Sequence, residues 1–244
     1  MGKELPPTLP LYGPDADNAN AVRAHITENA AQFRSNWITK REESEATLAI
    51  IRTAVAGARN KHLPGLAAIW DAATYMNIAS MDLAALGELL MFEQVEWRRR
   101  LHSRHAALLL FELFDDFSLI LGKEFRAAVG KLPDGISILS DLDAQSKKLN
   151  QTRNQFSSVL KLIRDYCVAH RDHSGVQQLE VIYHIQPTAI FRLCAEVDDQ
   201  INSLGSILMR ALMSSADNVP LFQEDESQDA RQDSKDNTGG SGDV

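Results

Sequence analysis

The chain has 244 residues, of which 44% are hydrophobic and 24% charged, the balance of a soluble globular protein. Its formal net charge is −8, and residues 221–244 carry −5 of it, so the rest carries only −3 and offers no general electrostatic attraction to nucleic acid. Two cysteines argue against a disulfide framework or a paired-cysteine zinc site, and the longest apolar run, Ala106–Phe111, is too short to span a membrane. We therefore expect a cytoplasmic protein with no membrane contact.

The first part of the chain predicts an arm followed by two helical stretches. Residues 1–15 are rich in proline and predict an irregular arm. From about residue 17, apolar residues recur every three or four positions, which is the period of an amphipathic helix. The charged run Lys40–Glu43 interrupts this stripe, which then resumes. Pro64 suits the first turn of a second helix, which we expect to run from about residue 66 into the nineties.

The middle of the chain predicts two further helices. Residues 97–129 are the most apolar, with apolar side chains over much of the helix circumference, and we expect this helix at the centre of the core. The segment GKLPDG at 130–135 predicts a turn. A fourth helix is expected from about residue 140 to His170, and the HSG sequence at 173–175 ends it.

Pro187 predicts the start of the last helix. Its apolar residues alternate steps of four and three: Ile190, Cys194, Val197, Ile201, Leu204 and Leu208. Packing within its own bundle is the favoured interpretation, and a contact between two chains is the alternative. Residues 175–185 fit either a helix or a short extended segment, and the acidic tail at 221–244 is expected to be disordered. The sequence thus predicts an all-α bundle of about five long helices over residues 16–215.

The end of the fourth helix holds the residues that suggest chemistry, R164-D-Y-C-V-A-H170. His170 is in phase with the apolar positions Ile163 and Cys167, and a histidine at such a position is ordinarily a hydrogen-bonded core residue. Arg164 lies six positions earlier, which is ~9 Å along a regular helix and about 120° around it. Arg164 and His170 can therefore act together only if the helix end is bent or a second copy of the helix contributes.

This segment resembles the motif of the HEPN superfamily, an Arg, a polar residue and a short apolar run before a His. Here five residues separate Arg164 from His170, with Asp165 at the polar position, and the ending A-H-R-D172 is similar to abortive-infection-type members. The resemblance covers about residues 97–212. It implies a HEPN-like bundle that forms a homodimer, in which two Arg–His pairs face one cleft and cleave RNA without a metal.

The resemblance also implies roles for individual residues. Arg164 would bind the scissile phosphate through two parallel hydrogen bonds and stabilise its charge. His170, with an ordinary pKa near ~6.5, would move a proton to or from the RNA 2′-hydroxyl or the leaving oxygen. Asp165 would orient Arg164 or the histidine of the second copy. We expect further substrate contacts from Arg171, His173 and Arg104, and neither a cofactor nor a metal.

The implied biological role is that of a toxin or antiphage defence effector, under the control of an antitoxin or regulatory protein. One toxin branch carries a Tyr two positions after the His, where its antitoxin attaches nucleotides. This chain has Asp172 there, which argues against that form of regulation. The alternative from another class is a non-catalytic HEPN-like helical module that binds a protein partner or a nucleotide.

Several weaker arrangements stay open from the sequence alone. Histidines three positions apart can share a metal, a buried thiol beside a histidine can be a nucleophile, and clustered carboxylates can bind cations. In each case the ordinary interpretation is a polar helix face or a packed side chain, and the Trp, Phe and Met residues are expected to fill the core. The residues concerned are His170, Asp172, His173 and His184 for a metal, Cys167 with His170 as a nucleophile pair, His102 with His105, and Glu112 with Asp115 and Asp116.

Overall fold

The computed structural model describes residues 16–168 and 175–222 and shows an all-α protein, with no strand in these two ranges. The predicted arm, the predicted tail and residues 169–174 lie outside the described residues. The helices are α1 (Ala16–Glu28), α2 (Ala30–Asn60), α3 (Pro64–Phe92), α4 (Glu96–Ile120), α5 (Lys123–Gly130), α6 (Gly135–Ile163), the π-helical turn η1 (Arg164–Val168), α7 (Gly175–His184) and α8 (Pro187–Asp217).

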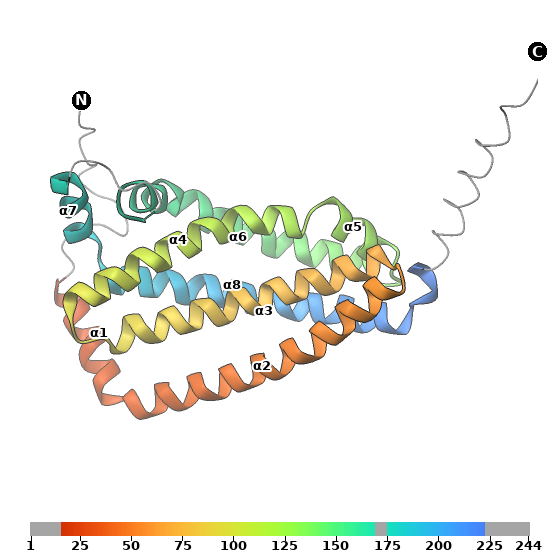
Figure 1. Ribbon diagram of the computed structural model, residues 1–244, viewed down its shortest axis with the longest axis horizontal. Coiled ribbons are helices and arrows are strands. Elements are labelled where there is room, and N and C mark those ends of the chain that lie inside the picture. Colours follow the sequence, from red (N-terminus) through yellow and green to blue (C-terminus); the bar gives the residue numbers. More distant parts are fainter. Residues whose placement is uncertain (1–15, 169–174, 223–244) are drawn as a thin grey trace, which may run out of the picture.

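Five long helices, α2, α3, α4, α6 and α8, form an elongated bundle, as the sequence predicted (Figure 1). The short helix α7 stands across one end of the bundle, beside the start of α4. The junction between α2 and α3, together with α5, lies at the other end. No helix in the described part of the chain is long and apolar enough to cross a bilayer.

The core is built around α3, which packs against α2, α4, α5 and α8. The sequence predicted that the helix over residues 97–129 lies at the centre of the core. In the structure its counterpart, α4, shares the centre of the core with α3. All six stripe residues of α8 are buried against the helices of their own chain. The predicted packing of this helix within its own bundle is therefore confirmed, and its stripe is not available for a contact between two chains.

The helix boundaries differ from the prediction at two glycines. The expected helix 97–129 breaks after Leu121, where a Cβ on Gly122 would lie 2.7 Å from the carbonyl oxygen of Leu119. A Cβ on Gly135 would lie 2.2 Å from the carbonyl oxygen of Val129, so only glycine fits where α6 begins. Both turns need a backbone approach that any other side chain would obstruct.

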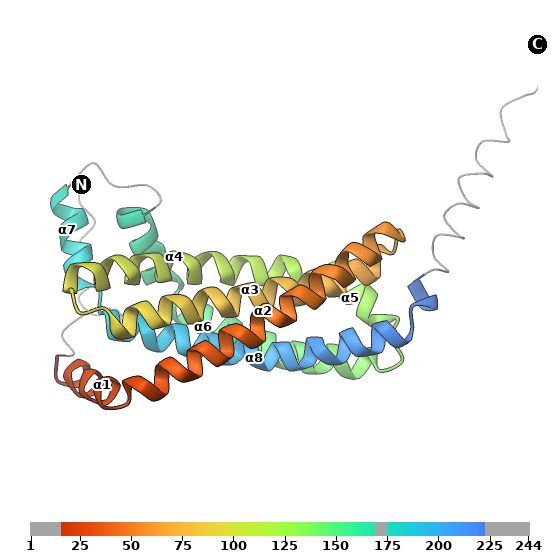
Figure 2. The same cartoon turned by 60° about the horizontal axis from the view of Figure 1, so that its bottom comes forward.

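Helix α2 has an unusual position for an element of 31 residues. Only Ile51 and Ala58 of its side chains are buried. It packs along α3, and Figure 2 shows that it runs obliquely across the bundle. The charged run Lys40–Glu43 lies within this continuous helix, and Lys40 pairs with Asp198 of α8.

Candidate functional site

The segment that resembles the HEPN motif begins where α6 changes into the π turn η1. The α6 residues Phe156, Leu160 and Ile163 are buried, and Cys167 in η1 continues the buried stripe, as predicted. A π turn closes its hydrogen bonds one residue later than an α-helix, and such turns occur frequently at functional sites. The angle of about 120° derived for a regular helix therefore does not apply beyond Arg164. The turn packs against α4, α6 and α7.

Arg164, the first residue of η1, is held by side chains of α4 and of its own turn. Its guanidinium carbon lies 4.7 Å from the centre of the Phe111 ring. Its Nε lies 3.4 Å from Glu112 Oε1, and its Nη1 lies 3.6 Å from Asp165 Oδ1. These are ion-pair distances without hydrogen-bond geometry, and the buried Nε has no hydrogen-bond partner among the described residues.

Arg100 of α4 differs from Arg164 in its hydrogen bonds to backbone carbonyls. Its Nη1 donates hydrogen bonds to the carbonyl oxygens of Ile182, Tyr183 and Ile185, at 2.8, 2.7 and 3.0 Å. These carbonyls lie at the end of α7, where a helix leaves acceptors without partners inside the helix. Arg100 therefore fixes α7 to α4, whereas Arg164 donates to no carbonyl in the described part of the chain.

Arg104, expected to contact substrate, is buried. Its Nε donates to the carbonyl oxygen of Arg100 at 3.3 Å, and its guanidinium carbon lies 5.7 Å from the centre of the Trp97 ring. A phosphate could be reached only if this side chain moved. Arg99, also buried, has its pKa lowered by burial and by the nearby Arg23. The arginines at the start of α4 thus do not form an open basic track.

The structure describes only some of the other expected site residues. Asp165 Oδ1 lies 3.6 Å from Arg164 Nη1, and its orienting role stays a prediction. His170, Arg171 and His173 lie outside the described residues, and so does Asp172 of the possible metal site. The structure therefore places Arg164, Asp165 and Arg104 at one end of the bundle.

The thiol of Cys167 is unsuited to act as a nucleophile. Burial raises its pKa to about 11, and the nearby Arg104 only partly offsets this effect. The thiolate, which is the reactive form, is therefore scarce at neutral pH. The burial of this thiol argues against the Cys–His nucleophile pair left open by the sequence.

The carboxylates of α4 do not form a cation site. Glu112 pairs with Arg164, Asp115 pairs with Arg153 of α6, and Asp116 accepts a hydrogen bond from the Tyr75 hydroxyl at 2.8 Å. His184 donates from Nδ1 to the carbonyl oxygen of Glu180 in its own helix, at 2.7 Å. In the described ranges, no three His, Cys, Asp or Glu side chains are grouped so that they could hold a metal.

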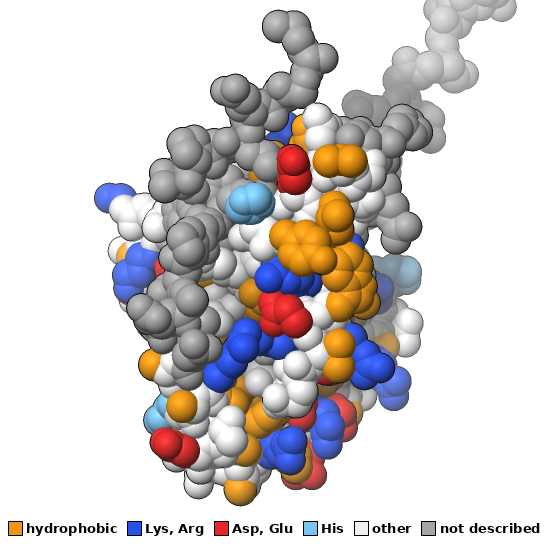
Figure 3. Space-filling view, turned by 90° about the vertical axis from the view of Figure 1, so that its left-hand side faces the viewer, with side chains coloured by type: hydrophobic (Ala, Val, Ile, Leu, Met, Phe, Trp, Pro, Cys, Tyr) orange, Lys and Arg blue, Asp and Glu red, His pale blue; other side chains and the backbone are white. Residues whose placement is uncertain are grey.

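The sequence did not predict the exposed apolar face beside this site. Val176, Leu179 and Tyr183 are exposed and follow the helical spacing along α7, and the Tyr183 ring contacts the exposed Trp97 at 6.5 Å between ring centres. Figure 3 shows hydrophobic side chains gathered on this end of the molecule, next to basic and acidic side chains. Trp97 was expected in the core; only the arrangement of α4 and α7 shows that it is at the surface.

Comparisons of the chain with protein-family models, with curated proteins and with solved structures found no match. The HEPN resemblance therefore depends on the motif and its helical setting.

Proposed function

We propose that this protein is a HEPN-type endoribonuclease that acts as a homodimer in toxin or antiphage defence. Arg164 binds the scissile phosphate, with Asp165 beside it as the orienting carboxylate. His170 of one copy takes the proton of the RNA 2′-hydroxyl as its oxygen attacks the adjacent phosphorus. His170 of the other copy gives a proton to the leaving 5′-oxygen, so the products carry a 2′,3′-cyclic phosphate and a 5′-hydroxyl.

The observation that supports this proposal best is the state of Arg164. A structural arginine near a helix end usually donates to backbone carbonyls, as Arg100 does. Arg164 instead lies on the face of Phe111, and its side chain keeps 27% of its surface exposed. Its five N–H donors make no hydrogen bond within the described residues, and its two carboxylate contacts are long. A phosphate could replace these contacts with shorter, charge-assisted hydrogen bonds.

A phosphate that binds Arg164 has to displace the two carboxylates that now neutralise it. Glu112 and Asp165 are partly exposed, so their long ion pairs with Arg164 are weak and easily exchanged. The proposed binding is local, because residues 1–220 carry a small negative charge.

The test is RNA cleavage in EDTA by the wild type and by Arg164→Ala, Arg164→Lys and His170→Ala. Arg153→Ala is the matched control, since Arg153 lies on α6, three helical turns before Arg164, and also pairs with a carboxylate of α4. We expect Arg164→Ala to lower the cleavage rate by about 10²-fold or more. Arg164→Lys should restore it only in part, because lysine cannot form the two parallel bonds.

Two results would contradict the proposal that this protein is a ribonuclease. One is cleavage by folded Arg164→Ala or His170→Ala at the wild-type rate, and the other is an equal loss in Arg153→Ala. If the wild type cleaves no RNA from a varied set, the non-catalytic alternative is favoured.

The exposed apolar face of α7 and α4 supports that alternative, a module that binds a protein partner. Trp, Tyr and Arg are the residue types that contribute most to protein interfaces, and here Arg100 lies 5.4 Å below the centre of the exposed Tyr183 ring. Replacing both Trp97 and Tyr183 by alanine should abolish such binding. Under the enzyme proposal, the same double variant keeps Arg164 in place and cleaves RNA.

A further inference from the structure

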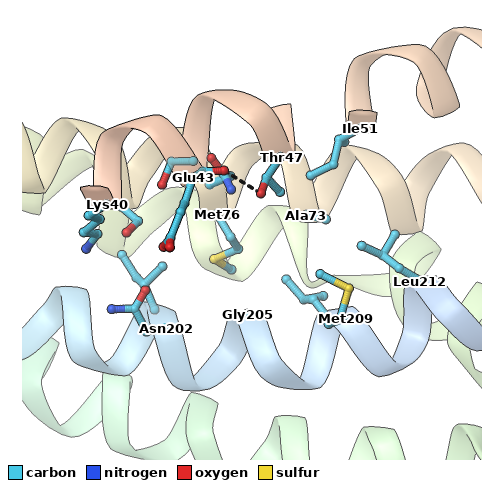
Figure 4. A pocket seen from close by; sticks show the side chains of 15 residues that line it. Lys40, Glu43, Thr47, Ile51, Ala73, Met76, Asn202, Gly205, Met209 and Leu212 are labelled. Atoms are coloured by element: carbon cyan, nitrogen blue, oxygen red, sulfur yellow. Dashed lines mark hydrogen bonds between the residues drawn. The ribbon is translucent and has the colours of Figure 1, made fainter. Parts of the chain in front are cut away.

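The cleft between α2 and α8 is hollow and lies away from the proposed RNA site. Helix α2 packs on α3, and α8 packs along another side of α3, so α3 forms the floor of the cleft between them. The hollow has a volume of about 320 Å³, at the lower end of the roughly 300–1,000 Å³ typical of small-molecule sites. Figure 4 shows side chains from α2 and α8 pointing into this space.

One end of the cleft is closed by a polar cluster. Lys40 of α2 pairs with Asp198 of α8, and the Ser80 hydroxyl of α3 donates to the same carboxylate at 2.7 Å. The ammonium of Lys40 is therefore already neutralised by Asp198, and it leaves no net positive charge for a ligand.

Two acceptors in the cleft, one buried and one exposed, have no donor among the described residues. Asn77 Oδ1 of α3 is buried without a hydrogen-bond partner, although buried amide oxygens are nearly always paired. Glu43, an exposed residue, extends from α2 toward α8 (Figure 4), and its carboxylate has no ion pair among the described residues. With Lys40 and Asp198 cancelling, the cleft has a charge of −1 from Glu43. It therefore favours a ligand that is positively charged and donates hydrogen bonds.

The rest of the cleft is lined by apolar side chains and, at one position, by helix backbone without a side chain. Ile51, Met76, Leu208, Met209 and Leu212 supply apolar and thioether surface. Gly205 lies in the middle of α8, and a Cβ placed there would meet nothing within 4 Å. Alanine is therefore sterically allowed and is the better helix former, so neither packing nor helix formation explains this glycine. The missing side chain leaves room for a ligand to lie against the helix backbone.

We propose that this cleft binds a small amphipathic amine. Its ammonium group donates to Asn77 Oδ1 and pairs with Glu43, and its apolar part lies along Gly205 between Met76 and Met209.

The experiment uses hexylamine as the probe, with hexanol and hexanoate as neutral and anionic molecules of the same chain length. Each is titrated into the full-length protein, and binding is followed by calorimetry and by amide NMR shifts. Saturable binding of hexylamine is expected, with shifts in α2, α3 and α8. Hexanol should bind at least about tenfold more weakly, because it lacks the charge that pairs with Glu43, and hexanoate more weakly still.

The variants locate the site. Glu43→Gln should weaken hexylamine binding by about tenfold, whereas Glu42→Gln, one position away on α2 and outside the cleft lining, should leave it unchanged. Gly205→Leu should abolish binding by filling the cleft. If this variant does not fold, Glu43→Gln still decides the assignment.

Four results would overturn the proposal. They are no saturable binding of hexylamine, hexanoate binding as tightly as hexylamine, and equal effects of the two glutamate variants. The fourth is amide shifts in the cleft that follow protein concentration instead of amine concentration, since a second copy of the chain would then fill it.

Discussion

The contact between Arg100 and the end of α7 gives the most quantitative prediction. Arg100→Met keeps the length and apolar stem of the side chain but removes its donors. The wild-type Nη1 serves three carbonyl oxygens at 2.7 to 3.0 Å, but it carries only two hydrogens. Two charge-assisted bonds at about 1.5–3 kcal/mol each give a loss of about 3–6 kcal/mol in the free energy of unfolding. The partly exposed pair with Glu96 at 3.0 Å adds less than about 1 kcal/mol.

The assay is urea denaturation followed by circular dichroism, together with amide hydrogen exchange of α7. Arg98→Met is the control on the same helix, since Arg98 is 68% exposed and lies 3.8 Å from Glu93. The control should change the free energy of unfolding by less than about 0.5 kcal/mol. A loss below about 1 kcal/mol in Arg100→Met, with unchanged exchange in α7, would refute the assignment of Arg100 as the residue that fixes α7.

Two further predictions concern stability. Burial raises the pKa of the Cys167 thiol to about 11 and that of Cys194 to about 12, so the unfolded chain loses these protons first, from about pH 9. The free energy of unfolding should therefore be independent of these thiols below about pH 8.5 and then fall by up to about 1.4 kcal/mol per pH unit for each thiol. Cys167→Ala should make the fall between about pH 9 and 10.5 shallower. An unchanged slope would contradict the raised pKa of Cys167. Gly205→Ala should raise the free energy of unfolding by about 1 kcal/mol in urea denaturation, because the Cβ meets no neighbour; a decrease would show that the cleft is tighter than described.

The long helices could be predicted because their apolar periodicity is strong. The alternating stripe of α8 and the positions Ile163 and Cys167 are buried as expected. Helix α7 could not be assigned from its ten residues, because its end is fixed by Arg100, which lies 82 residues earlier in the chain than Ile182. The break at Gly122 follows from a close backbone approach that a three-to-four periodicity does not reveal.

The candidate site was predictable only as a motif. The sequence identified Arg164 and Asp165, but not the π turn that carries them or the Phe111 ring on which Arg164 lies. Contacts between α4 and η1 join residues more than fifty positions apart, so no local pattern records them. Trp97 shows the same limit, since its exposure depends on how α7 crosses the end of α4.

The most direct test of the central claim is the chemistry of the RNA ends after incubation with the wild-type protein in EDTA. If Arg164 and His170 catalyse attack by the 2′-hydroxyl, the products carry 2′,3′-cyclic phosphates and 5′-hydroxyls. An RNA with a single 2′-deoxy substitution at the cleaved position then stays intact. Products with 5′-phosphates, or cleavage at the deoxy position, would contradict the account, because the attacking oxygen would not then come from the RNA.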